Sequence, residues 1–172
     1  MFLRIVTIGM VAALITGCAG EVKRQGNLVA PEKLSVQKYK QVTVSLDDKA
    51  QSQLSDNVQF DPDRLRDTIQ RVMKAKGMIA PNAQDKLDIK ITDIRVRSNF
   101  SAIMFGFMAG SDHVTGTLKP LDPADKPLDT FEVSASYALG GLGGGQDDAR
   151  MGWLYDKFAE LTVKELTGQS QQ

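Results

Sequence analysis

The only histidine of the chain, His113, follows Ser111 and Asp112, so three residue types that serve in hydrolytic triads are adjacent. In such a triad the histidine takes a proton from the serine hydroxyl, and the carboxylate orients the imidazole ring. The alternating apolar residues that follow predict a strand here, and neighbouring residues of a strand point to opposite faces. These side chains therefore cannot converge on one substrate atom, and we expect His113 to be a surface histidine.

Two pairs of adjacent aspartates, Asp47–Asp48 and Asp147–Asp148, could offer oxygen ligands to a divalent cation. Aspartate is also favoured in turns and as the N-terminal cap of helices, and these roles explain both pairs more simply. One histidine and one cysteine are too few for a structural zinc site with four such ligands. We predict no metal site.

Five glycines between positions 140 and 145 precede a predicted helix, which is where phosphate-binding loops lie. A nucleotide-binding P-loop ends in lysine followed by serine or threonine, whereas this segment continues into Gln146, Asp147 and Asp148. Carboxylates at the start of a helix would repel phosphate. We interpret the glycines as a connection between strand and helix, and we expect no cofactor, no catalytic residues and no enzymatic activity.

The single cysteine, Cys18, ends a short apolar segment. Arg4 is the only charge before the run from Ile5 to Ile15, which is shorter than the roughly 20 residues of a membrane-spanning helix and is typical of a secretory signal. The sequence Ile15-Thr16-Gly17-Cys18 resembles a bacterial lipobox. The resemblance implies cleavage before Cys18 and acylation of that cysteine, with chains such as palmitate. The alternative is a plain signal peptide that leaves an incidental cysteine.

The residue after the cysteine is Ala19. In lipoproteins of this type an aspartate there favours retention in the inner membrane, so its absence favours the outer membrane. Each buried acyl methylene contributes about 0.8 kcal/mol, and several chains would hold the protein durably on a bilayer. We therefore expect a bacterial envelope protein, bound to the outer membrane by its lipid anchor and facing the periplasm.

Length and charge bound the remaining possibilities. The chain has 172 residues, 21 basic and 21 acidic side chains, so its zero net charge gives no reason to expect a nucleic-acid partner. We divide it into a signal peptide (1–17), a lipidated N-terminus and flexible tether (18–38), a single α+β domain (39–168) and a disordered tail (169–172).

Apolar residues recur with period two over 41–46, 86–97, 114–118 and 131–139, which predicts four strands. In the second of these the apolar phase changes, so we predict a β-bulge near Thr92 and Asp93.

Apolar residues that recur with a period of about 3.6 residues predict two helices. The first begins with Asp61 as N-cap and Pro62 in the first turn and ends at Gly77, and the second covers about 148–167.

The order is therefore β-α-β-β-β-α, and two amphipathic helices can cover one face of the sheet. We predict an α+β two-layer sandwich with an approximately four-stranded, mainly antiparallel sheet and two helices on one face. The other face would be polar and open to solvent, formed by Thr43, Ser45, Lys90, Arg95, Arg97, Thr115, Thr117, Lys119, Glu132, Ser134 and Ser136.

With the lipobox, this element order, Gly110 before the third strand and the glycine cluster before the last helix, residues 38–168 resemble a group of small bacterial lipoproteins, the domain of unknown function 4410. The architecture is also similar to the N-terminal domain of TolB-type proteins and to curli-secretion lipoproteins. The family carries no established catalytic residues, so the resemblance assigns none.

The segment from Phe100 to Gly110 is uncharged and rich in phenylalanine and methionine. Its large apolar side chains could complete the core, or they could form an adaptable contact surface for a partner or for lipid. A membrane-inserted hairpin would need about twice this length. The candidate contact residues are Phe100, Ile103, Met104, Phe105, Phe107 and Met108.

Two functions fit these features. In the first, the protein is a non-catalytic binding or accessory module that docks an envelope protein through a sheet edge or through the apolar segment. The alternative is a carrier of a small apolar or lipid-like ligand, which would need a cavity among Phe131, Tyr137, Tyr155 and Phe158.

Overall fold

The computed structural model describes residues 19–24, 34, 37–98, 110–138 and 147–168. Within them a five-stranded sheet has the strand order β1-β5-β4-β3-β2. Its strands are β1 (Ala19–Arg24), β2 (Tyr39–Leu46), β3 (Asp85–Arg95), β4 (Asp112–Leu121) and β5 (Phe131–Tyr137). The helices are α2 (Asp48–Gln53), α3 (Pro62–Ala75) and α5 (Asp147–Leu166), and a 3₁₀ turn, η1 (Leu54–Asp56), follows α2.

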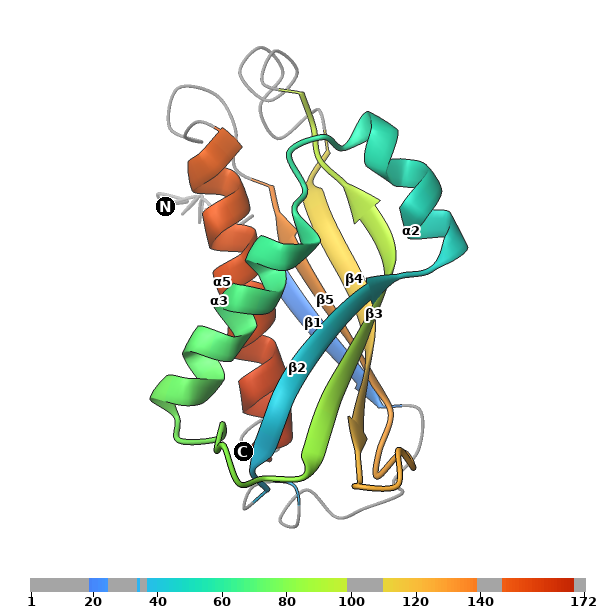
Figure 1. The fold of residues 1–172 in the computed structure, drawn as a ribbon. Helices are drawn as coiled ribbons and strands as arrows, with labels where there is room; N and C mark the ends of the chain where they lie inside the picture. The colour runs from blue at the N-terminus through green and yellow to red at the C-terminus, as the bar shows by residue number, and fades with distance from the viewer. Residues whose placement is uncertain (1–18, 25–33, 35–36, 99–109, 139–146, 169–172) are drawn as a thin grey trace, which may run out of the picture.

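The helices α3 and α5 lie side by side on one face of the sheet (Figure 1). The strands β2 and β3 are parallel and are connected through α3, whereas β3–β4, β4–β5 and β5–β1 are antiparallel. The α+β class is confirmed. The prediction of four strands and two helices is wrong in detail, because the described residues contain a fifth strand, β1, and a third helix, α2.

The helix α3 follows the local sequence closely. The Asp61 carboxylate accepts hydrogen bonds from the backbone N–H groups of Asp63 (2.9 Å) and Arg64 (3.1 Å), and Pro62 opens the helix. Its apolar stripe faces the sheet, with Leu65, Ile69 and Met73 fully buried. Gly77 has φ of +66°, the left-handed conformation that ends the helix.

The predicted bulge is confirmed, since the β3–β4 register shifts between Ile91 and Asp93. The shift lets Ile91 and Ile94 both face the helices. On β4, Gly116 lets the Phe158 ring of α5 approach the sheet, because a Cβ at Gly116 would lie 3.2 Å from the tip of that ring.

The opposite face of the sheet is open among the described residues, and ten of the eleven residues predicted there are exposed or half-buried. Arg97 is the exception: the prediction is wrong, because the strand ends at Arg95 and the side chain of Arg97 is only 2% exposed.

The edge strand β1 corrects the predicted tether over 18–38, because Ala19–Arg24 pairs with β5 along its whole length. Arg24 holds the strand: its guanidinium forms ion pairs with Asp129, before β5, and Glu165, near the end of α5. Both carboxylates are almost completely buried. Gly20 adds a close contact, since a Cβ there would overlap the Leu161 side chain at 2.4 Å.

We predict that Arg24→Ala lowers the free energy of unfolding by about 3–5 kcal/mol, because it leaves two carboxylates buried without their cation. Denaturant unfolding of the purified chain measures the change. Lys23→Ala is the matched control, since Lys23 is 60% exposed and surface changes stay within about 0.5 kcal/mol. Equal stability of the two variants would contradict the role of Arg24.

Candidate functional site

The sequence-predicted site residues lie outside the described residues. These are Cys18, Phe100, Ile103, Met104, Phe105, Phe107 and Met108, and the glycine cluster at 140–145 lies outside as well. The structure does place the residues that flank them.

The flanking residues gather at one end of the sheet. Ala19 pairs with Ser136, Ser136 with His113, and His113 with Arg95, which makes one row across four strands. Arg97 and Gly110 lie beyond this row, and Arg97 Nη1 donates to the Gly110 carbonyl at 2.7 Å. Ala19, Arg97 and Gly110, the last residue of the apolar segment, therefore lie at the same end of the sheet.

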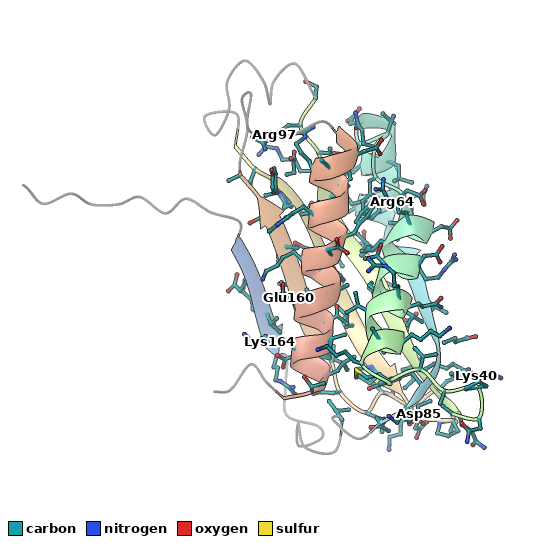
Figure 2. All side chains as sticks on the ribbon, turned by 90° about the vertical axis from the view of Figure 1, so that its left-hand side faces the viewer. Lys40, Arg64, Asp85, Arg97, Glu160 and Lys164 are labelled. Atoms are coloured by element: carbon teal, nitrogen blue, oxygen red, sulfur yellow. The ribbon has the colours of Figure 1, made fainter. Side chains whose placement is uncertain are left out.

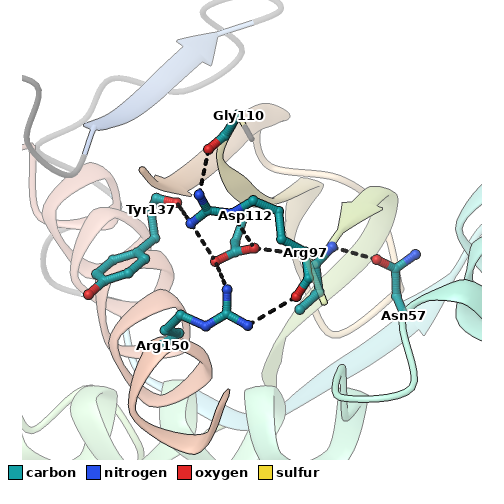
Figure 3. Close-up of polar contacts among 7 residues, drawn as sticks. Asn57, Arg97, Gly110, Asp112, Tyr137 and Arg150 are labelled. Atoms are coloured by element: carbon teal, nitrogen blue, oxygen red, sulfur yellow. Dashed lines mark hydrogen bonds and ion pairs between the residues drawn. The ribbon is translucent and has the colours of Figure 1, made fainter. Parts of the chain in front are cut away.

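A buried charged cluster lies at this end, formed by Arg97, Asp112 and Arg150 (Figure 3). Asp112 Oδ1 accepts from the Arg97 backbone N–H at 2.7 Å and from its Nε at 3.2 Å. Asp112 Oδ2 accepts from Arg97 Nη2 at 3.2 Å and from Arg150 Nη1 at 3.1 Å. The Asp112 carboxylate thus forms ion pairs with both guanidiniums. The side chains of all three residues are no more than 2% exposed.

The two guanidiniums of the cluster also contact the main chain. Arg97 Nη2 donates to the Tyr137 carbonyl at 3.3 Å, and Arg150 Nη2 donates to the Arg97 carbonyl at 3.0 Å. Asn57 adds a contact from the other side, because its side-chain oxygen accepts from the Val96 backbone N–H. The cluster therefore joins the ends of β3, β4 and β5 to the first turns of α5.

A second polar group lies on the open face, around Asp93. His113 Nε2 lies 2.7 Å from Asp93 Oδ2, while Lys49 Nζ (2.6 Å) and Gln53 Nε2 (2.9 Å) contact Oδ1. Partial burial alone would raise the pKa of Asp93, but the hydrogen bonds from Lys49, Gln53 and His113 outweigh it and hold that pKa well below its usual range.

The predicted geometry of the Ser111-Asp112-His113 sequence is confirmed for its last two members. Asp112 points to the helix face and His113 to the open face. The partner of His113 is Asp93 from the neighbouring strand, which sequence spacing did not indicate.

The adjacent aspartates have structural contacts. Asp47 caps α2 by accepting from the Ala50 backbone N–H at 2.8 Å, which confirms the predicted cap. Asp148 Oδ1 forms an ion pair with Nη1 of Arg64 in α3, at 3.2 Å. In the described ranges no three His, Cys, Asp or Glu side chains come together as metal ligands would.

Two grooves border α3. One, of about 470 Å³, lies beside β2 and is lined by Lys40, Asp67, Gln70, Arg71, Lys74, Ile79 and Pro81. The other, of about 200 Å³, lies between α3 and α5 and is lined by Val72, Lys76, Asp156, Glu160, Val163 and Lys164. Neither groove is lined by the four aromatic residues between which a carrier would need a cavity. These residues are buried in the core: Phe131, Tyr137, Tyr155 and Phe158.

The described part of the chain is a two-layer α+β domain with one open sheet face and a charged cluster buried at one end of the sheet. None of its helices is long and apolar enough to cross a membrane. A family model, Domain of unknown function (DUF4410), matches residues 24–141, which is more than half of the chain. The chain belongs to this family.

Solved structures with similar folds share little sequence with the chain. Two are PelC dodecamers from Paraburkholderia phytofirmans, one of them a variant in which methionine replaces a leucine. The variant has a TM-score of 0.47 at 12% identity, with 86% of this chain and 97% of that chain covered. The other has a TM-score of 0.46 at 12% identity, with 87% and 97% covered. A minor lipoprotein from Acinetobacter baumannii has a TM-score of 0.41 at 13% identity, with 77% and 95% covered. Curated proteins give no match to the chain.

We predict that Asp112→Asn lowers the free energy of unfolding by about 3–5 kcal/mol, because two buried guanidiniums lose their shared anion. Urea unfolding monitored by circular dichroism measures the change. Asp88→Asn is the matched control: Asp88 lies on the open face, where its carboxylate accepts from the Thr43 hydroxyl at 2.8 Å. A loss no larger than that of the control would contradict the structural role of the cluster.

The lowered pKa of Asp93 predicts a pH dependence. An unfolded aspartate takes up its proton near pH 3.9, whereas folded Asp93 remains ionised to lower pH. Its contribution to the free energy of unfolding is therefore complete above about pH 5 and is lost as the pH falls from there through the lowered folded pKa. We expect the free energy of unfolding of Asp93→Asn to fall less steeply below pH 5 than that of the wild type.

Asp56→Asn, at an exposed aspartate of η1, serves as the control for this profile. Parallel profiles for Asp93→Asn and the wild type would show that the contacts of Asp93 do not favour its ionised form.

Proposed function

We propose that the protein is an outer-membrane lipoprotein, acylated at Cys18 and facing the periplasm, whose domain is a non-catalytic binding or accessory module. The observation that carries this proposal is the position of β1, which begins at Ala19, the residue directly after Cys18.

This position supports an anchor that holds the domain close to the bilayer. Consecutive Cα atoms are 3.8 Å apart, so an acylated Cys18 leaves no free linker between the lipid and the sheet. Arg24 and its two buried carboxylates keep β1 in the sheet, and Gly20 lies against Leu161 of α5. The domain therefore carries its anchor on a strand of its own fold.

The binding role is supported by what the same end of the sheet holds in place. The Arg97–Asp112–Arg150 cluster holds Arg97, which precedes the uncharged segment in the sequence, next to Gly110, its last residue. Phenylalanine and methionine together make adaptable contact surfaces, so the partner we propose is another envelope protein. The guanidiniums of Arg97 and Arg150 contact the Asp112 carboxylate and main-chain carbonyls, which favours a positioning role over a catalytic one.

The anchor is tested by fractionation of envelopes that contain the wild type or Cys18→Ser, after labelling with radioactive palmitate. We expect the wild type to carry label and to lie in the outer membrane, with a reproducible crosslinked partner. Cys18→Ser should lose the label and leave that fraction, because no acyl chain holds it.

Ala19→Asp separates acylation from destination: it should keep the label and move to the inner membrane. An unlabelled wild type, or a Cys18→Ser variant that remains in the outer membrane, would contradict the proposal.

A further inference from the structure

The strand β3 extends beyond the end of its neighbour β2. The last pair between these strands joins Leu46 to Ile91, and the Asp47 N–H donates to the Ile91 carbonyl at 2.9 Å. From there β3 continues to Arg95 and remains paired with β4. In the described part of the chain no strand lies on the other side of these last residues. An unpaired strand edge of this kind is a template for pairing with another chain.

The segment formed by α2 and η1 lies against this part of β3 (Figure 1). At the end of α2, the side-chain oxygen of Gln53 accepts from the Ile94 backbone N–H at 2.9 Å. The side-chain oxygen of Asn57 accepts from the Val96 backbone N–H. Ile94 and Val96 are two residues apart, so their N–H groups point to the same side, away from β4. Two side-chain amides thus occupy the positions of two carbonyls of an absent strand.

The spacing of the two amides matches that of the strand. Four residues of α- or 3₁₀-helix rise about 6–8 Å, and two residues of a strand span about 6.6 Å. The amides are also linked to each other, because Asn57 Nδ2 donates to the Gln53 carbonyl at 2.7 Å. Asn57 is only 6% exposed, and Ala50 of α2 is fully buried. The segment is therefore packed onto the strand edge as a unit, although it is short and mostly polar.

A further contact holds the segment from the open face of the sheet. Asp93 Oδ1 accepts from Gln53 Nε2 at 2.9 Å and lies 2.6 Å from Lys49 Nζ. Arg97, two residues beyond the end of β3, lies at the same end of the molecule as α2 (Figure 2). Its backbone N–H donates to Asp112 Oδ1 at 2.7 Å, so N–H groups on both sides of this strand end are bound by side chains.

We propose that α2 and η1 form a protective cap, which closes the edge of β3 beyond the end of β2 and keeps it from pairing with the same edge of a second copy of this chain. A helix that only covered the edge would leave its N–H groups without acceptors, which is costly. Here the amides of Gln53 and Asn57 supply the acceptors. The inference goes beyond the proposed anchor and binding role and depends on neither.

The closing of the edge is tested with Gln53→Met and the matched control Gln51→Met, in the full chain purified in detergent. Methionine keeps the length of the side chain but offers no acceptor to Ile94. In residue-resolved hydrogen exchange, the Ile94 amide of Gln53→Met should lose about ten times more protection than the Ile89 amide. Ile89 pairs with both β2 and β4 and reports the stability of the whole sheet. Gln51 is exposed on the same helix, so its variant should change neither amide.

The protective role is tested with the double variant Gln53→Met/Asn57→Leu. Its control is Gln51→Met/Asn82→Leu, which changes the same residue types at exposed positions. Sedimentation velocity over a concentration series should show a larger species for the first variant at concentrations where the control and the wild type agree. Circular dichroism verifies that both are folded. If the double variant does not fold, Gln53→Met alone is compared with Gln51→Met at higher concentration.

An Ile94 amide that loses no more protection than Ile89 in Gln53→Met would overturn the assignment of Gln53 to the cap. A folded double variant that exchanges faster at Ile94 but keeps the size of the wild type would overturn the protective role. Neither result bears on the palmitate labelling of Cys18, so the cap and the proposed function fail separately.

Discussion

The Asp112 carboxylate is the constraint on which one end of this domain depends. Burying an ion costs several kcal/mol, and the cost is recovered only where geometry and hydrogen bonds are good. Here a single carboxylate accepts from two guanidiniums and one backbone N–H. The guanidiniums in turn donate to the carbonyls of Gly110, Tyr137 and Arg97. The ends of β3, β4 and β5 are thus fixed relative to α5.

Features that depend on neighbouring residues could be predicted from the sequence. The start of α3 at Asp61 and Pro62, its end at Gly77 and the bulge near Asp93 all follow from local chemistry or from the phase of apolar residues. The polar open face was predictable for the same reason, because a period of two assigns each side chain to a face. The opposite directions of Asp112 and His113 follow from that period as well.

Features that depend on distant residues could not be predicted. The strand β1 has one apolar side chain facing the helices, Val22, and is held by Asp129 and Glu165, which lie more than a hundred residues away. The six residues of α2 are mostly polar and show no apolar stripe. Arg97 is buried because it contacts Asp112 and Arg150. The sequence alone predicts the opposite, because a charged residue in an alternating pattern ordinarily lies on the solvent-exposed face. The contact between His113 and Asp93 has the same origin, since only the pairing of β3 with β4 brings them together.

The two edges of the sheet differ in charge and in the contacts that cover them. The β1 edge is short, carries Glu21 and Lys23, and is fixed by the contacts of Arg24. The β2 edge is longer and is uncharged over Val42–Leu46, and in the described part of the chain its outer side is paired with Ile79 at Tyr39 and contacted by the Gln70 side chain at Val42. The contacts of Ile79 and Gln70 thus protect part of an edge whose own side chains are uncharged, whereas buried ion pairs fix the charged edge at β1.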